Sequence, residues 1–151
     1  MSRRIILGSA AALVVLGGAG AFALAQAGEQ PPTLNESTAR YVAPAADREG
    51  SFTFTTAVTA PSGVKSLKVM AWPADSSFVA KDPLTEKELA AAESAACKPI
   101  GDDASRCTYR VTVTAAEAAE SAKGRWYVAT LVTADNGDTA FNDRTATFTV
   151  D

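Results

Sequence analysis

The chain has 151 residues, enough for one ordinary domain, and a formal net charge of -3. It contains no histidine, which excludes a Ser-His-Asp or Cys-His catalytic set and removes the commonest metal ligand. The mild acidity argues against nucleic acid or an anionic membrane surface as a partner. We therefore expect a protein with no catalytic, metal-binding or cofactor-binding residues.

Residues 1–27 have the three parts of a cleavable signal peptide: a basic start at Arg3 and Arg4, an apolar uncharged run and a small-residue end. Cleavage is expected after Ala27, with Ala25 as the second choice. The product is then secreted and has no membrane attachment. A retained anchor is the alternative, because the apolar run is nearly long enough to span a bilayer. The arginine pair partly matches the twin-arginine export motif, but the general secretory route is preferred.

The segment after the signal peptide is polar and rich in proline. Residues 28–40, which include Pro31 and Pro32, predict a flexible leader, and a single domain is expected over 41–151. Residues 41–43 are expected to form a short edge strand that ends at Pro44.

Two strands with an alternating pattern follow. Residues 51–60 place phenylalanine and valine on one face and mostly threonine on the other, which predicts a half-buried strand. Residues 64–72 form the next strand and end at Trp72. We expect its ring to lie in the core; if exposed, Trp72 is the best candidate for a contact residue, because aromatic rings supply a large contact area at low entropic cost.

A helix is predicted over about 86–95. Thr85 and Glu88 form a capping box, and an alanine-rich run follows. Glu86, Glu88 and Glu93, with Asp102 and Asp103 further on, are the acids that a carboxylate-only glycosidase would use. Stabilisation of the helix dipole by Glu86 and Glu88 and solvation of the two loop aspartates are the preferred interpretations.

The only two cysteines, Cys97 and Cys107, predict a disulfide, because an even count in an exported chain favours pairing. Two free thiols are the alternative. The bridge would tether the intervening loop 98–106 and tie the end of the helix to the start of the next strand.

Residues 106–114 alternate again, with Cys107 and Tyr109 on the inner face. Thr114 and Glu117 form a second capping box, which opens a short helix to about Ala122. Gly124 fits as the left-handed cap of that helix.

An almost uncharged run over 126–133 predicts the central strand, buried on both faces, with Trp126 and Tyr127 pointing to opposite sides. A tight hairpin is expected at Asn136-Gly137. Asp135, Asn136 and Asp138 are a weak calcium signal. The last strand, 139–150, is expected to bulge at 142–144.

Four segments carry a resemblance to a known family: 37–44 (STARYVAP), 62–73 (SGVKSLKVMAWP), 105–109 (SRCTY) and 124–128 (GRWYV). The chain is similar to a family of small secreted actinobacterial (Streptomyces-type) proteins of unknown function with an Ig-like β-sandwich domain. The strand, helical crossing and Gly-x-aromatic-aromatic-Val series also resembles the E to G region of immunoglobulin-like and fibronectin-type domains. The resemblance implies secretion and a sandwich fold, and it implies no activity.

The expected fold is therefore mainly β: a single antiparallel Ig-like or fibronectin-type sandwich of six or seven strands with one short helical insertion. The expected function is that of a secreted non-catalytic module that contacts an extracellular protein or a cell-wall component through its surface and loops. The alternatives are a small protease inhibitor that presents loop 98–106 and an enzyme that uses carboxylates alone.

Overall fold

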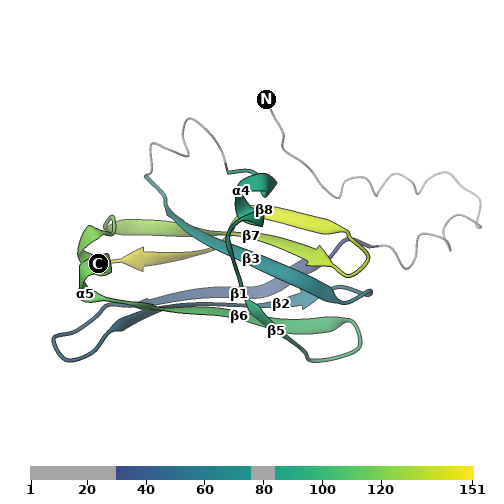
Figure 1. The fold of residues 1–151 in the computed structure, drawn as a ribbon, viewed down its shortest axis with the longest axis horizontal. Helices are drawn as coiled ribbons and strands as arrows, with labels where there is room; N and C mark the ends of the chain where they lie inside the picture. The colour runs from purple at the N-terminus through teal and green to yellow at the C-terminus, as the bar shows by residue number, and fades with distance from the viewer. Residues whose placement is uncertain (1–29, 76–83) are drawn as a thin grey trace, which may run out of the picture.

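The computed structural model describes residues 30–75 and 84–151, which form two antiparallel sheets packed face to face (Figure 1). The predicted signal peptide lies outside the described residues. The described part contains eight strands and two short helices. In chain order they are β1 (Thr33–Val42), β2 (Gly50–Thr59), β3 (Val64–Pro73), α4 (Glu86–Ala90), β4 (Glu93–Ser94), β5 (Ala96–Pro99), β6 (Ala104–Val113), α5 (Ala115–Glu120), β7 (Gly124–Ala134) and β8 (Thr139–Val150).

The first sheet has the order β1-β2-β6-β5 and the second has the order β4-β3-β7-β8. This arrangement corresponds to A-B-E-D facing C′-C-F-G in immunoglobulin-like sandwiches. The predicted antiparallel sandwich is confirmed. The two shortest strands, β4 and β5, raise the count above the expected six or seven, because strands of two and four residues are too short to show a period in sequence. In the described ranges no helix is long and apolar enough to cross a bilayer.

The main core lies between the sheets and is built from the predicted alternation. Phe54, Val58 and Leu67 are fully buried there. The central strand β7 is buried on both faces from Val128 to Val132, as predicted. Its inner face joins the main core, and its outer face joins a second apolar cluster.

Helix α4 lies over the outer face of the sheet β4-β3-β7-β8 (Figure 1), and the second apolar cluster packs between the helix and that face. Its buried members are Trp72, Leu84, Leu89, Ala129 and Leu131. The helix was expected to reach about residue 95, and this was wrong, because it ends at Ala90. Residues 93–94 instead pair with β3, and the amide of Ala95 donates to the carbonyl of Leu67 at 2.8 Å. Hydrogen bonding to a free sheet edge therefore outweighs the helix propensity of alanine.

The first strand differs from the flexible leader expected over 28–40 and from the short strand expected at 41–43. β1 begins at Thr33 and pairs with β2 along its length, from Thr33 opposite Thr59 to Val42 opposite Ser51. A bulge at Glu36, whose φ is 53°, interrupts the register. The bulge allows side chains on both sides of it to pack against the core.

The connection from β6 to β7 carries the chain from one sheet to the other at one end of the sandwich, where α5 lies (Figure 1). The predicted capping box at Thr114 and Glu117 is confirmed. The helix ends at Glu120, before the expected Ala122. Gly124 has a positive φ of 108° but is the first residue of β7 and does not cap the helix.

Candidate functional site

The two sheets pack tightly at one end and leave a cleft at the end where α5 lies. Towards the closed end, the inward residues Phe54 and Cys107 have no exposed area. Towards α5, the inward residues Tyr109, Val111 and Val113 are only half-buried. The cleft between the sheets has a volume of about 500 Å³, which lies within the range of small-molecule sites in proteins.

Aromatic rings from five strands line this cleft. Phe148 is central, with its ring centroid 4.7 Å from Phe52, 5.9 Å from Trp126 and 6.3 Å from Tyr41. Tyr109 continues the series at 6.2 Å from Phe52. Trp126 is fixed in place because its Nε1–H donates to the carbonyl of Ala122 at 2.8 Å. The rings of Tyr41, Tyr109, Trp126 and Phe148 are half-buried, so each leaves part of its surface open to a ligand.

Two carboxylates lie among the cleft residues: Glu93 from β4 and Glu117 from α5. The hydroxyl of Tyr109 donates to Glu93 Oε2 at 2.6 Å. Burial of the phenol, followed by this hydrogen bond and the negative charge of Glu93, raises the pKa of Tyr109 to about 12. The amide and hydroxyl of Thr114 donate to Glu117 and lower the pKa of its carboxyl group. Tyr109 is therefore protonated at neutral pH and Glu117 is ionised.

This arrangement suits binding. The walls are apolar and aromatic, and a few fixed acceptors stand among them. Each carboxylate already accepts a hydrogen bond from the protein and retains free lone pairs that a ligand hydroxyl or amine can use. Among the described residues, no group of three His, Cys, Asp or Glu side chains is placed to hold a metal ion.

Trp72 lies elsewhere, in the second apolar cluster on the outer face of its sheet. Its residue is only 6% exposed, and its Nε1–H donates to the carbonyl of Asp143 at 3.1 Å. The guanidinium of Arg144 lies 4.7 Å from the ring centroid of Tyr127 and 5.8 Å from that of Trp72. The contact role considered for Trp72 depended on an exposed ring, and this ring is covered.

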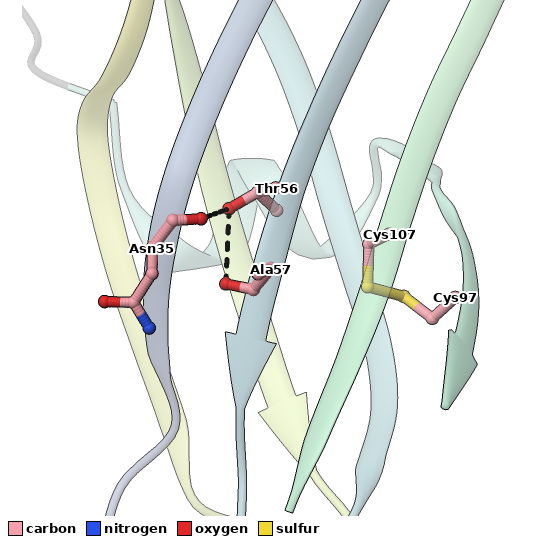
Figure 2. Close-up of a disulfide and its surroundings, with 5 residues drawn as sticks. All are labelled: Asn35, Thr56, Ala57, Cys97 and Cys107. Carbon is pink, nitrogen blue, oxygen red and sulfur yellow. Dashed lines mark hydrogen bonds between the residues drawn. A yellow bond between two sulfur atoms is a disulfide. The ribbon is translucent and has the colours of Figure 1, made fainter. Parts of the chain in front are cut away.

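Cys97 and Cys107 form a disulfide between directly opposed positions of β5 and β6, with their Cα atoms 4.0 Å apart (Figure 2). The bridge joins two neighbouring strands, and does not join a helix end to a strand as expected. Loop 98–106 is largely strand, since β5 and β6 pair as far as Pro99 opposite Ser105. Only the turn 100–103 projects, with Ile100 53% exposed.

The acids considered for glycosidase chemistry lie on different elements, and of them Glu93 alone lines the cleft. Glu88 lies on α4, outside the second sheet, where it accepts from the amide of Thr85 at 2.8 Å. Asp102 and Asp103 lie at the β5–β6 turn of the first sheet.

The calcium alternative involved Asp135, Asn136 and Asp138, which lie in the β7–β8 turn. The Nδ2 group of Asn136 donates to Asp138 Oδ2 at 2.9 Å, and its Oδ1 accepts from the amide of Asp138 at 3.0 Å. These side chains therefore stabilise the turn itself.

Sequence reasoning missed the cleft as a site. Tyr109 was expected on an inward face, which is correct, but inward residues were interpreted as core. A signal was present: the inward positions nearest the β6–β7 crossing are aromatic on several strands. Only the register between strands shows that these positions share one end of the sandwich.

The fold and the cleft define an antiparallel β-sandwich module with an open, aromatic-lined end. The chain belongs to a family of unknown function (DUF5707), which matches residues 34–132. The matched range begins in β1 and ends in β7, so it includes strands of both sheets and most of the cleft. No curated protein matches the chain.

Proposed function

We propose that the protein is a secreted, non-catalytic Ig-like module that contacts an extracellular protein or a cell-wall component through its surface and loops. The cleft between the sheets is the recognition site in this proposal. The observation that carries it is an opening of about 500 Å³ lined by partly exposed aromatic rings. The predicted signal peptide and the Cys97–Cys107 disulfide support an extracellular location, since such bridges persist in oxidising compartments.

Of these partners, a cell-wall glycan suits the cleft best. A sugar ring has apolar C–H faces, which pack on aromatic rings such as Trp126 and Tyr41, and hydroxyl groups at its rim. The carboxylates of Glu93 and Glu117 are acceptors for those hydroxyls. The absence of histidine and the separation of the other acids support a role in binding without catalysis.

A titration with soluble cell-wall oligosaccharides tests this proposal. We expect protection of Trp126 fluorescence from a soluble quencher on binding. Trp126→Ala should weaken binding about tenfold or more, which is the usual effect of truncating an aromatic anchor. Trp72→Phe is the matched control, because Trp72 belongs to the other apolar cluster. This variant should bind the oligosaccharides as tightly as the natural chain does. Lack of binding, or equal loss in both variants, would reject the cleft as a glycan site.

A protease inhibitor is the second candidate function, favoured by one observation. The disulfide holds a two-stranded hairpin whose turn presents Ile100, one of two large apolar residues that are exposed in the described chain. A panel of serine proteases and metalloproteases, assayed with the natural chain and Ile100→Ala, tests this role. We expect inhibition that the substitution weakens; no inhibition by the natural chain removes the candidate.

A further inference from the structure

The outer face of the sheet β1-β2-β6-β5, called the basic face below, gathers positive charge. Phe52, Phe54 and Cys107 point into the core, so alternate residues on the same strands point outward. The outward positions carry four of the 14 lysine and arginine residues of the chain: Arg40, Lys98, Arg106 and Arg110. All four are exposed.

The register places these cations in two rows across the sheet. Arg40 lies opposite Thr53, which lies opposite Arg110 on the next strand. Since neighbouring strands are about 4.8 Å apart, the backbones at Arg40 and Arg110 are separated by about 10 Å. Arg106 and Arg110 lie four residues apart on β6, about 13 Å along the strand. Between the two rows runs a row of hydroxyl groups: Thr38, Thr55 and Thr108.

On the strands of the basic face the positive charge is largely uncompensated, and the nearest other acids lie in the turns at the ends of the strands. Lys98 lies directly opposite Arg106, and like charges in that position destabilise a sheet. On the described strands of this face, Glu36 is the single acid. Its carboxylate lies 3.7 Å from Arg106, and the two side chains are 72% and 47% exposed, so the pair is weak. A chain with a net charge of -3 therefore presents a positive face against an acidic remainder.

We propose that the basic face binds an extended anionic polysaccharide. The four cations are spread over about 10 by 13 Å of the sheet, an area that suits a chain with repeated negative groups better than one small anion. The threonine hydroxyls between them can hydrogen-bond sugar hydroxyls, which an inorganic polyanion lacks. The only large exposed apolar residue of the face is Val42, at 36%, which is too little to insert into a lipid surface.

The basic face and the cleft are on opposite sides of the same sheet. On β6, Tyr109 points into the cleft and Arg110 points away from it. A failure of the cleft to bind its ligand therefore leaves this proposal intact, and the reverse also holds. Trp126→Ala serves as the check, because it should leave binding to the basic face unchanged.

The test measures binding of the purified protein to polygalacturonate, a polysaccharide with one carboxylate on each sugar, at low and high salt. Dextran is the neutral control. We expect binding to polygalacturonate alone, weakened by salt. The double variant R40Q/R110Q should bind about tenfold more weakly. The control variant K87Q/R125Q changes the net charge equally but lies on the other sheet and on α4, and should bind within about twofold of the natural chain.

Glu36→Gln should raise the affinity for polygalacturonate. A misfolded variant would lose affinity, so a gain cannot result from misfolding. Removing this carboxylate frees Arg106, so binding to polygalacturonate should strengthen about twofold. Four results would overturn the proposal: no binding at low salt, equal losses in R40Q/R110Q and K87Q/R125Q, equal binding to dextran, or tighter binding to phosphatidylglycerol vesicles or to inorganic polyphosphate than to polygalacturonate.

Discussion

Replacing Leu89 with alanine should loosen the packing of α4 on the second sheet and lower the free energy of unfolding by about 2–3 kcal/mol. Leu89 has no exposed area and packs in the cluster with Trp72 and Leu131. The five residues of α4 are too few to be helical alone, so the docked leucine holds the helix in place. Core Leu→Ala changes cost about 2–5 kcal/mol. The lower part of that range applies because a short surface helix can settle and fill part of the cavity.

Leu89→Ala should also change the environment of Tyr109 in the cleft. The segment that follows α4 carries Glu93 to the position where it accepts a hydrogen bond from Tyr109. Loosening that segment removes two of the three causes that raise the pKa of Tyr109, while burial of the ring, the largest cause, remains. The pKa of the phenol should therefore fall from about 12 towards its ordinary value of 10.0 without reaching it.

Urea unfolding followed by far-ultraviolet circular dichroism gives the stability change, and absorbance of ionised tyrosine gives the pKa. In a Trp126→Phe background, Trp72 is the only tryptophan, and its emission should shift to longer wavelength in Leu89→Ala. Lys87→Ala, an exposed change on the same helix, should stay within about 0.5 kcal/mol of its parent. A loss below about 1 kcal/mol with unchanged Trp72 emission would refute the role given to Leu89.

Three further predictions concern the Cys97–Cys107 disulfide, the hydroxyl of Tyr109 in the cleft, and Gly50 at the start of β2. The double variant C97A/C107A should lose about 3 kcal/mol of unfolding free energy in urea, because the bridge closes a loop of sequence separation 10; a loss under about 1 kcal/mol would contradict the loop-closure argument. Because the pKa of Tyr109 is raised in the folded state, its stabilising contribution is complete below pH 10 and is lost as the pH rises through about 12. In unfolding experiments at pH 9 to 12, Tyr109→Phe should remove the part of the stability loss that comes from ionisation of Tyr109. The same pH dependence of stability in the variant and the natural chain would contradict this role of Tyr109. Gly50→Ala should destabilise by more than about 2 kcal/mol, since its Cβ would collide with the backbone at the end of β1; Gly101→Ala, in open space, should be nearly neutral in the same thermal melts.

The strands that face the core from the middle of each sheet could be predicted from the sequence, because their alternation is a local property. β2, β3, β6 and β7 have the expected extents within one or two residues. β1 could not be predicted in this way. It lies at a sheet edge, most of its residues are exposed, and its bulge interrupts the period of two.

The two buried threonines show what long-range pairing adds. Thr56 interrupts an apolar series in β2, and the sequence gives no reason for it. In the structure its hydroxyl donates to the carbonyl of Asn35 at 3.1 Å, beside the bulge in β1 (Figure 2). Thr130 acts similarly beside the bulge in β8, 2.6 Å from the hydroxyl of Thr145. Each buried hydroxyl thus satisfies polar groups at an irregular edge strand, a need that exists only once the strands are paired.

The cleft also depends on non-local structure. Its rings come from five strands, and none is unusual in its own segment. Whether an inward aromatic is buried or remains half-exposed depends on how far the opposite sheet extends over it. No periodicity encodes that distance, so the difference between Phe54 and Trp126 appears only in the folded chain.

The unequal packing of the two ends has a consequence for hydrogen exchange. β6 and β7 each run between the closed end and the open end, so one strand samples both environments. Amides near Cys107 and Val132 should exchange only through global unfolding, whereas those near Val113 and Arg125 should exchange through smaller local openings. A ligand that fills the cleft would slow exchange at the second pair and leave the first unchanged. Protection measured along a single strand would therefore locate the ligand without any label on it.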